Sequence, residues 1–480
     1  MTPNSISYIA FLLAAAVVHS LLPARCRTVF LLLASYGFYL LCSPKALPLL
    51  LAATAWNYAL ARAMEDRPAR KKLWLILGLC LDLGVLFLFK YLNFSISLID
   101  LILGRAPGEP LSLLMPAGVS FYTFTVCGSL MDVYRGKRPA ERSIVRFALF
   151  VAFFPAILSG PIERAGHLLP QLERRRRASL EDWQRGSLRF LIGLCKKMVL
   201  ADRLAILVNA AFAVHDQCTG AQLLAAALAY SLQIYCDFSA YSDMAIGSAR
   251  LLGVTLAENF DSPYFSRSIK DFWRRWHISL SSWFRDYLYV PLGGSRKGKA
   301  RTWLNLLIVF ALSGLWHGAA LTFVVWGVLN GMYQIVGDAL LPLRQGLHKA
   351  LRLGEDCLLL RVVQTVIVFL LSTVAWVFFR AGSMAQALEI LRRIFTATGG
   401  FVLPDLVALG IGRSWLLVVG VGVILLFLFD LLDRRRLIPE RLCAVVAPRY
   451  AVCLALVLAT LIFGAYGAGY DAQEFVYFRF

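Results

Sequence analysis

The sequence predicts an all-α polytopic membrane protein, and three observations lead to that class. Hydrophobic residues make up 59% of the 480 residues, whereas a soluble domain is about half apolar. Apolar runs recur from one end of the chain to the other, and a helix needs about 20 such residues to cross a bilayer. Basic residues gather between these runs, as they do beside membrane spans. We therefore expect a single membrane domain over residues 1–480 rather than several soluble domains.

The candidate spans follow one another along the whole chain. No basic region precedes the first run, so that run is predicted to be a retained span and not a cleaved signal peptide. Around eleven spans are expected, together with re-entrant or interfacial helices. The apolar runs that support them cover residues 6–22, 28–41, 47–61, 73–92, 111–131, 144–158, 187–213, 221–236, 302–327, 358–379, 415–432 and 450–466. Shorter runs at residues 94–103 and 241–252 are ambiguous.

The net charge of +20 does not indicate a nucleic-acid partner, because the cations lie between apolar runs and not on one exposed face. They are expected to face the cytoplasm and anionic lipid headgroups. Arg25, Arg27 and the cluster at residues 62–72 reach the cytoplasm if the N-terminus lies outside. Basic stretches at residues 135–142 and 174–177 flank the single apolar run at residues 144–158, and one crossing there would put them on opposite sides of the membrane. A re-entrant hairpin in this run would keep both stretches on the same side.

The segment at residues 261–301 differs from the spans because aromatic and charged side chains are mixed in it. One interpretation is an amphipathic helix at the membrane interface. The other is a helix that dips into the protein and lines a cavity. Read as one helix, the segment carries a single stripe formed by Trp273, Trp276, His277, Leu280 and Phe284.

His317 is the first candidate for chemistry, because it lies inside the apolar run at residues 302–327. A titratable side chain within a span is costly and by default indicates a functional site. Gly314 and Gly318 flank it and are expected to leave open volume beside the imidazole for a substrate or a close helix. A neutral imidazole is a good general base near neutral pH. A core histidine that joins two helices is the alternative, and so is a weaker Ser–His pair with Ser313.

A second polar feature interrupts the apolar region around residues 236–243. Asp237, Ser239, Tyr241 and Asp243 lie there, although a span should not hold two carboxylates. Helix capping at the end of a span explains Asp and Ser at such a break. The functional alternative is a polar wall of a substrate tunnel, and both interpretations stand at this point.

Other patterns exclude several classes of site. The ten cysteines are dispersed without CxxC spacing, so neither a zinc site nor a disulfide framework is predicted. The stretch Gly293 to Lys299 satisfies GxxxxGK, but Ala300 follows where a P-loop needs a hydroxyl for magnesium. The remaining histidines are expected to be solvated or interfacial, namely His19, His167, His215 and His348.

Long sequence blocks resemble the membrane-bound O-acyltransferase (MBOAT) family, in its bacterial branch that modifies alginate, peptidoglycan and teichoic acid. The resemblance covers nearly the whole chain and is most specific over residues 115–330. It rests on MPAGVSFYTF from Met115, DVYRG from Asp132, QIYCDFSAYSDMAIG from Gln233, ENF from Glu258, DFWRRWHISLSSWFRDYLY from Asp271, LWHGA from Leu315, WVFFRA from Trp376 and FVYFRF from Phe475.

The resemblance implies about 11 transmembrane helices around a central tunnel, with re-entrant or interfacial helices. It places His317 at the narrowest point as the catalytic base and His277 in the same funnel as the second catalytic histidine. The neighbouring residues then take roles around the substrates. Trp276 and Trp316 would shape the tunnel, Asp237, Ser239 and Tyr241 would line its wall, and Arg274 and Arg275 would meet phosphates of coenzyme A or lipid.

The implied function is transfer of an acetyl group from a cytoplasmic thioester, with acetyl-CoA as donor, to an extracytoplasmic polysaccharide. Residues 292–298 (LGGSRKG) favour the acetyl branch over the D-alanyl branch. No bound cofactor or metal is expected. A separate SGNH-type partner would complete the transfer outside the bacterial inner membrane. Alternatives are D-alanyl transfer to teichoic acid from a carrier protein, a transporter or flippase, and a scaffold. The glycan, whether alginate, cellulose or peptidoglycan, stays open.

Overall fold

The computed structural model describes residues 1–105, 108–350, 354, 357–399, 411–434, 446–466 and 475–476. Within these ranges the regular structure is helical, apart from one isolated antiparallel bridge between Phe260 and Trp276. This confirms the predicted all-α class. Most of the closing block FVYFRF, beyond Val476, lies outside the described residues.

The chain packs as two compact units, and the boundaries between them fall inside α9 (Leu180–Cys195), inside α11 (Gly220–Leu251) and between Glu258 and Asn259. The first unit contains residues 1–192 and 241–258, and the second contains residues 193–240 and 259–480. The expectation of one membrane domain over the whole chain stays a prediction.

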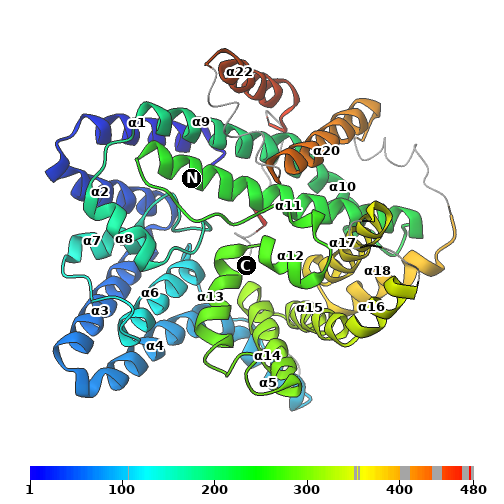
Figure 1. Ribbon diagram of the computed structural model, residues 1–480, viewed down its shortest axis with the longest axis horizontal. Coiled ribbons are helices and arrows are strands. Elements are labelled where there is room, and N and C mark those ends of the chain that lie inside the picture. The colour runs from blue at the N-terminus through cyan, green and yellow to red at the C-terminus, as the bar shows by residue number, and fades with distance from the viewer. Residues whose placement is uncertain are drawn as a thin grey trace. The chain divides into compact units, whose positions relative to one another are not determined.

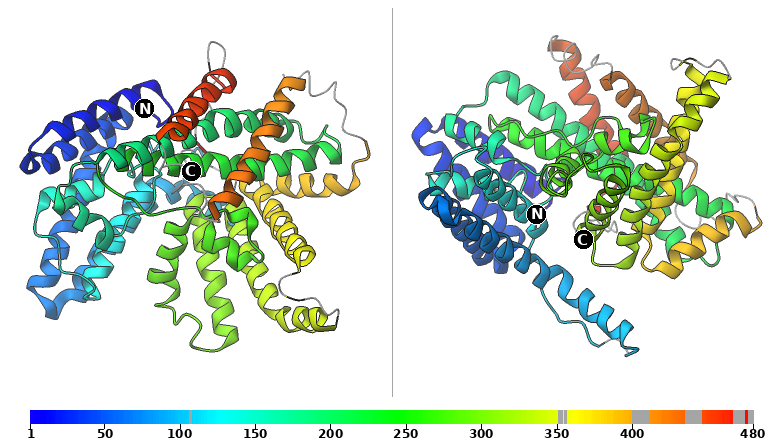
Figure 2. Two further views of the ribbon diagram at one scale, coloured as in Figure 1. Left: turned by 45° about the horizontal axis from the view of Figure 1, so that its top comes forward. Right: turned by 60° about the horizontal axis from the view of Figure 1, so that its bottom comes forward.

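The first unit is built from antiparallel neighbours joined by short turns. In Figures 1 and 2, α1 and α2 lie side by side, and α3, α4 and α6 pack against one another. Proline begins the short turns after α2 and α3, where its missing N–H costs nothing. The helices are α1 (Ile6–Leu21), α2 (Ala24–Cys42), α3 (Leu47–Asp66), α4 (Lys71–Leu86), α5 (Leu92–Ile102), α6 (Val119–Tyr134), α7 (Ile144–Ala152) and α8 (Ala165–Arg174), with most of α9 and the end of α11.

The second unit holds most of the aromatic side chains considered below. A π-helical segment, η4 (Lys196–Ala201), joins α9 to α10, and another, η6 (Arg285–Tyr289), follows α13. Such widened turns occur often at functional sites. The remaining helices are α10 (Asp202–Ala213), α12 (Ile269–Arg275), α13 (Ile278–Phe284), α14 (Lys299–His317), α15 (Leu321–Ala339), α16 (Leu341–Ala350), α17 (Leu358–Arg380), α18 (Met384–Thr396), α20 (Arg413–Arg434) and α22 (Val446–Phe463).

Helices α14 and α15 form a tight antiparallel hairpin (Figure 1). A Cβ on Gly314 would lie 2.1 Å from the carbonyl oxygen of Phe323, and a Cβ on Gly327 would lie 2.1 Å from that of Phe310. A Cβ on Gly318 would lie 2.2 Å from the Phe323 ring. Of the two uses expected for the space at Gly314 and Gly318, a substrate or a close helix, the structure shows the close helix. These glycines let two helices and a ring approach closely.

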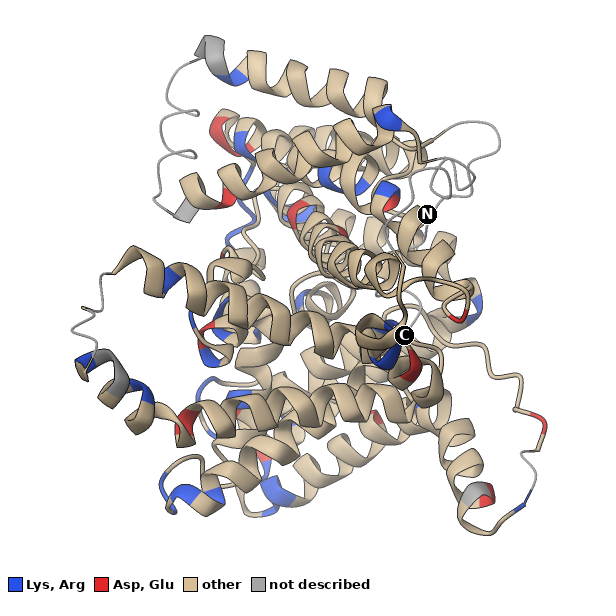
Figure 3. Cartoon of the chain, turned by 90° about the vertical axis from the view of Figure 1, so that its right-hand side faces the viewer, with Lys and Arg blue, Asp and Glu red and all other residues tan. Residues whose placement is uncertain are grey.

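Five described helical stretches are long and apolar enough to cross a membrane, and two shorter ones are apolar. Figure 3 shows long lengths of helix without Lys, Arg, Asp or Glu. The crossing candidates are Ala24–Cys42, Pro68–Asp100, Gly220–Leu251, Leu358–Arg380 and Arg413–Leu432, and the shorter ones are Ile6–Leu21 and Arg449–Phe463. A polytopic membrane fold is thus supported, while the number of eleven spans stays a prediction.

Three predicted runs differ from the helices that form. The runs at residues 221–236 and 241–252 are one helix, α11, so the polar residues between them do not cap a span. The run at residues 144–158 is no single helix, because α7 ends at Ala152 and turns follow. The run at residues 111–131 becomes helical only from Val119.

Candidate active site

The chain breaks its helical path at His277. Helix α12 ends at Arg275, Trp276 is extended, and His277 takes a left-handed backbone conformation with φ of 43° before α13 begins. Such a φ is uncommon for a residue with a Cβ and often marks a functional position. Backbone hydrogen bonds fix the break: Asp261 N donates to Arg275 O at 3.0 Å and Ile278 N donates to Asn259 O at 3.0 Å. The single helical stripe predicted through His277 was therefore wrong.

Asn259 orients the His277 side chain. Its Oδ1 accepts hydrogen bonds from the Ser279 backbone N–H at 3.2 Å and the Ser279 hydroxyl at 2.7 Å, and it lies 3.3 Å from His277 Nδ1. An acceptor at that position selects the tautomer with a proton on Nδ1, which makes Nε2 an acceptor. His277 is fully buried, outside the candidate spans, and burial lowers its pKa to about 3. The imidazole is consequently neutral at physiological pH.

His317 ends α14 inside a shell of aromatic rings. Its side chain is 2% exposed. The centroid of its ring lies 4.9 Å from that of Trp316, 5.1 Å from that of Trp326 and 5.4 Å from that of Phe379. The His277 ring lies 6.3 Å away and is 6.2 Å from Trp316. Two histidines from separate helices are therefore brought together, with Trp316 beside both.

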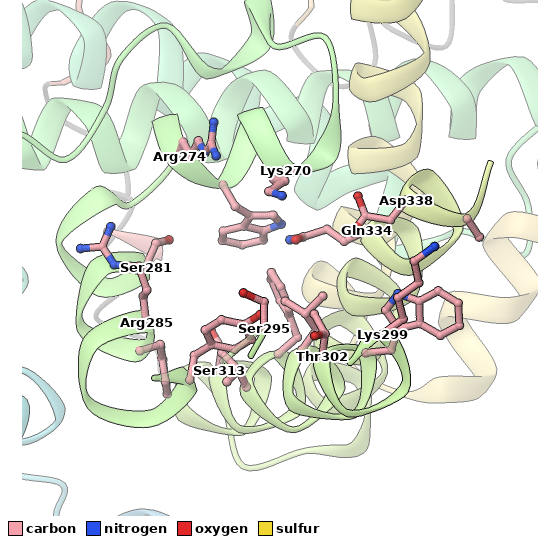
Figure 4. Close-up of a pocket in the computed structure, with 18 of the residues that line it drawn as sticks. Lys270, Arg274, Ser281, Arg285, Ser295, Lys299, Thr302, Ser313, Gln334 and Asp338 are labelled. Carbon is pink, nitrogen blue, oxygen red and sulfur yellow. The ribbon is translucent and has the colours of Figure 1, made fainter. Parts of the chain in front are cut away.

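A large cavity of about 1100 Å³ lies along α14 in the second unit. It extends from Lys299 to Ser313, a length of about 21 Å of helix. Figure 4 shows Lys270 and Arg274 on one side of the cavity and Ser295, Thr302 and Ser313 on the opposite side. Four cations line it, namely Lys270, Arg274, Arg285 and Lys299. Asp338 also lines the cavity, so cations outnumber carboxylates four to one there. A cavity of this size with an excess of cations suits an elongated anionic ligand.

A small cavity of about 300 Å³ has different walls. Lys197 is fully buried there between two carboxylates, with Nζ 2.9 Å from Asp202 Oδ1 and 2.7 Å from Asp237 Oδ1. Amide and hydroxyl side chains continue the wall, and two phenylalanine rings close it, as shown by the lining residues Asn209, Gln233, Thr322, Phe323 and Phe379. These groups suit a ligand that carries hydroxyls.

His317 lies between the two cavities along the α14–α15 hairpin. The large cavity reaches Ser313, one turn before His317, and also Ile278, which follows His277. The small cavity includes Phe323, just after the hairpin turn, and Phe379, whose ring contacts His317. Neither set of lining residues includes His317 itself.

The predicted site residues do not all line one cavity. Arg274 lines the large cavity and Asp237 the small one. Arg275 instead pairs with Asp271 at 3.0 Å and Asp261 at 3.2 Å, beside the break at His277. Ser239 is buried on α11, where its hydroxyl is 3.5 Å from Lys196 Nζ.

Two further predicted residues lie apart from the cavities. Trp276 is fully buried in an aromatic cluster, with ring centroids 5.0 Å from Trp376 and 5.1 Å from Phe260. Tyr241 belongs to the first unit, where its hydroxyl accepts from the backbone of Ser159. In the described part of the chain, no three His, Cys, Asp or Glu side chains gather as metal ligands would.

Comparison with known proteins decides the family. The model of MBOAT, the membrane-bound O-acyltransferase family, matches residues 138–379, which include both histidines and both cavities' main walls. The chain belongs to the membrane-bound O-acyltransferase family. It is accordingly an acyltransferase and a multi-pass membrane protein.

Curated relatives of this MBOAT protein differ in what their names say they act on. The chain is 41% identical to the probable alginate O-acetylase of Pseudomonas syringae pv. tomato, over 76% of this chain and 69% of the relative. It is 35% identical to the peptidoglycan O-acetyltransferase of Helicobacter pylori, over 81% and 77% respectively. It is 28% identical to the teichoic acid D-alanyltransferase of Bacillus subtilis, over 46% and 59%.

Several residues around the MBOAT histidines were not predicted from the sequence. Lys197 lies in the apolar run at residues 187–213, and a cation in such a run is itself a signal of an internal site. Trp326 and Phe379 are apolar residues in apolar runs, so no pattern separates them from ordinary core residues. Arg380 closes the WVFFR block and lines the small cavity, with its guanidinium 2.7 Å from Asn209.

Proposed function

We propose that this enzyme takes an acetyl group from acetyl-CoA on the cytoplasmic side of a bacterial inner membrane and passes it outward for O-acetylation of an extracytoplasmic polysaccharide. The observation that carries the proposal is the position of His317 between two cavities of different chemistry. Relatives named as O-acetylases or O-acetyltransferases support the acetyl group, because they match 76% and 81% of the chain. The D-alanyltransferase matches only 46%.

The large cavity suits the acyl donor. Coenzyme A carries phosphates at one end and the thioester at the other. Lys299, about 21 Å along α14 from Ser313, offers a cation for those phosphates at the end of the cavity away from His317, and charged donors form the stronger hydrogen bonds to phosphate oxygens. Lys270 and Arg274 flank Trp273 on α12, so they lie nearer the thioester end. The thioester then lies toward Ser313, the end of the cavity next to His317. Arg275 is not included, because two carboxylates already hold its guanidinium.

The reaction is an acyl transfer with His317 as general base. An acceptor hydroxyl approaches from the small cavity, and the His317 imidazole takes its proton as the oxygen attacks the thioester carbonyl carbon. The new C–O bond forms and the C–S bond breaks. The leaving thiolate then receives the proton from the imidazolium, which restores the neutral base. His277, fixed by Asn259 with its Nε2 as an acceptor, supports the orientation of the hydroxyl or of His317.

The final acceptor of the acetyl group is proposed to be a glycan. An extracytoplasmic partner of SGNH type would receive the acetyl group and complete transfer to an alginate-like or cell-wall polysaccharide. Reconstitution of the full chain with a candidate partner tests this point. Polymer acetylation is expected only when both proteins are present, and acetylation by this chain alone would contradict the need for a partner.

His317→Ala in the purified full-length protein tests the catalytic assignment. In proteoliposomes with labelled acetyl-CoA and acceptor, the wild type is expected to liberate CoA. The variant should lose about 10²–10⁴-fold of that rate, the usual contribution of a general base. His215→Ala is the matched control, because His215 lies near Gln386 outside both cavity walls.

Three outcomes decide between function classes. Normal CoA release by a folded His317→Ala protein would overturn the base assignment. Movement of label across the membrane without CoA release would indicate a transporter. Transfer of D-alanine from a carrier protein, but not of acetyl, would place the chain in the D-alanyl branch.

A further inference from the structure

Two aromatic rings form the part of the large cavity's wall that faces His317. Trp273 and Phe310 both line the cavity and are nearly buried, and their ring centroids are 5.3 Å apart at 66°. Trp273 comes from α12 and Phe310 from α14, so the wall joins two elements. Leu280 and Ser313 also line the cavity.

A second layer of rings stands between that wall and the candidate base. The Trp273 ring meets the Trp326 ring edge to face, with centroids 5.6 Å apart, and Trp326 meets His317 at 5.1 Å and 90°. The Trp273 and Trp326 indoles therefore lie in series between this part of the cavity wall and the His317 imidazole. An acyl group that approaches His317 along this wall must fit beside the Trp273 indole.

Hydrogen bonds hold the first indole in place. Trp273 Nε1 donates to Asn330 Oδ1 at 3.2 Å, and Asn330 Nδ2 donates to the Trp326 carbonyl oxygen at 2.8 Å. Asn330 is 2% exposed, so water does not compete readily for these bonds. A ring anchored at its polar edge and packed on its faces cannot easily turn aside for a longer substrate.

We propose that Trp273 sets the length of the acyl chain that the enzyme accepts, by blocking thioesters longer than acetyl at the part of the large cavity's wall that faces His317. This inference rests on the proposed function, which assigns that cavity to the thioester donor. It adds a limit on the substrate class, acetyl thioesters in preference to longer acyl thioesters, and the residue that sets this limit. Trp273 is a specificity-determining residue in this account, and it takes no proton and forms no bond.

Trp273→Ala and Trp273→Phe test the proposal in the full-length protein. CoA release is measured with acetyl-, propionyl-, butyryl- and hexanoyl-CoA. One methylene in an apolar site changes rates by roughly tenfold or more, so the wild type should lose at least about tenfold per added methylene. Trp273→Ala should raise the butyryl-to-acetyl rate ratio by at least about tenfold, and Trp273→Phe should give a smaller rise.

Trp303→Ala is the matched control, because Trp303 lines the same cavity about 21 Å along α14 from His317. Its chain-length profile should equal that of the wild type, whatever its absolute rate. An unchanged profile in folded Trp273→Ala and Trp273→Phe proteins would overturn the gate and leave the donor assignment intact. Absence of CoA release from every thioester by every protein would overturn the donor assignment and the gate together.

Discussion

At the scale of single residues, the strongest electrostatic feature is Lys197. Its ammonium lies 2.9 Å from Asp202 and 2.7 Å from Asp237, and all three side chains are at most 3% exposed. The second oxygen of Asp237 accepts a hydrogen bond from the backbone N–H of Val476 at 2.8 Å. Each carboxylate is thus compensated, which explains how α11 carries a charge in its middle.

Lys197→Met is expected to destabilise the folded protein by about 3–5 kcal/mol, because it leaves two buried carboxylates without their cation. The measurement is the thermal unfolding of the purified protein. Lys196→Met is the matched control, since Lys196 is adjacent and only half-buried, and it should change stability little. Equal unfolding temperatures for the two variants would show that the carboxylates do not depend on Lys197.

At the residue scale, the sequence singles out side chains whose chemistry is conspicuous, and their catalytic roles stay predictions. His317 and His277 stand out as titratable groups among apolar or aromatic neighbours, and the structure brings their rings within 6.3 Å. Arg274 and Arg275 look equivalent in sequence, yet only Arg274 lines the large cavity. The difference depends on Asp261 and on the break in the chain, neither of which helical spacing shows.

At the scale of elements, the α14–α15 hairpin positions the candidate base. Gly314 faces the backbone of Phe323, and Gly327 faces the backbone of Phe310. His317 is one turn beyond Gly314, so the separation of the two helices also sets the place of the imidazole.

Gly314→Ala is therefore expected to destabilise the protein by about 1–3 kcal/mol, the usual cost of an added methyl in a packed contact. CoA release should fall as well, because the displaced helix carries His317. Gly337→Ala on α15 is the control, since a Cβ there meets nothing within 4 Å, and it should be neutral or stabilising by about 1 kcal/mol. A Gly314→Ala protein as stable and active as Gly337→Ala would contradict the close approach.

Two element predictions failed for physical reasons that lie outside local sequence. Periodicity treats the segment around His277 as one helix, but tertiary hydrogen bonds from Asn259 and Asp261 favour a break there. Periodicity also splits α11 at its polar residues. The helix continues because distant partners compensate the carboxylates: Lys197 pairs with Asp237, and Arg189 pairs with Asp243.

At the scale of the whole molecule, orientation in the membrane is testable through Cys26. This cysteine is exposed and stands between Arg25 and Arg27 in the first turn of α2, next to the short connection from α1. The positive-inside rule places that connection in the cytoplasm. A membrane-impermeant maleimide should therefore label Cys26 in inverted vesicles and not in intact cells.

The control is Cys26→Ser, which should lose the label assigned to this position while the other cysteines keep theirs. Labelling of Cys26 from outside intact cells would reverse the predicted orientation.

The membrane class was predictable from hydropathy alone, whereas the cavities were not. Apolar runs locate helices, because a span must satisfy its backbone internally. The walls of the two cavities combine side chains from several helices far apart in sequence, such as Lys197, Asp237 and Arg380. Such sets arise only from tertiary packing.

The aromatic shell of His317 also has a consequence for the cell. A water-filled path through an enzyme that draws on two compartments would conduct protons and dissipate the electrochemical gradient. Trp316, Trp326 and Phe379 surround the imidazole with apolar rings, and hydrated ions do not enter such an environment. Under the proposed export of acyl groups, the same rings are expected to act as an electrical insulator between the two compartments.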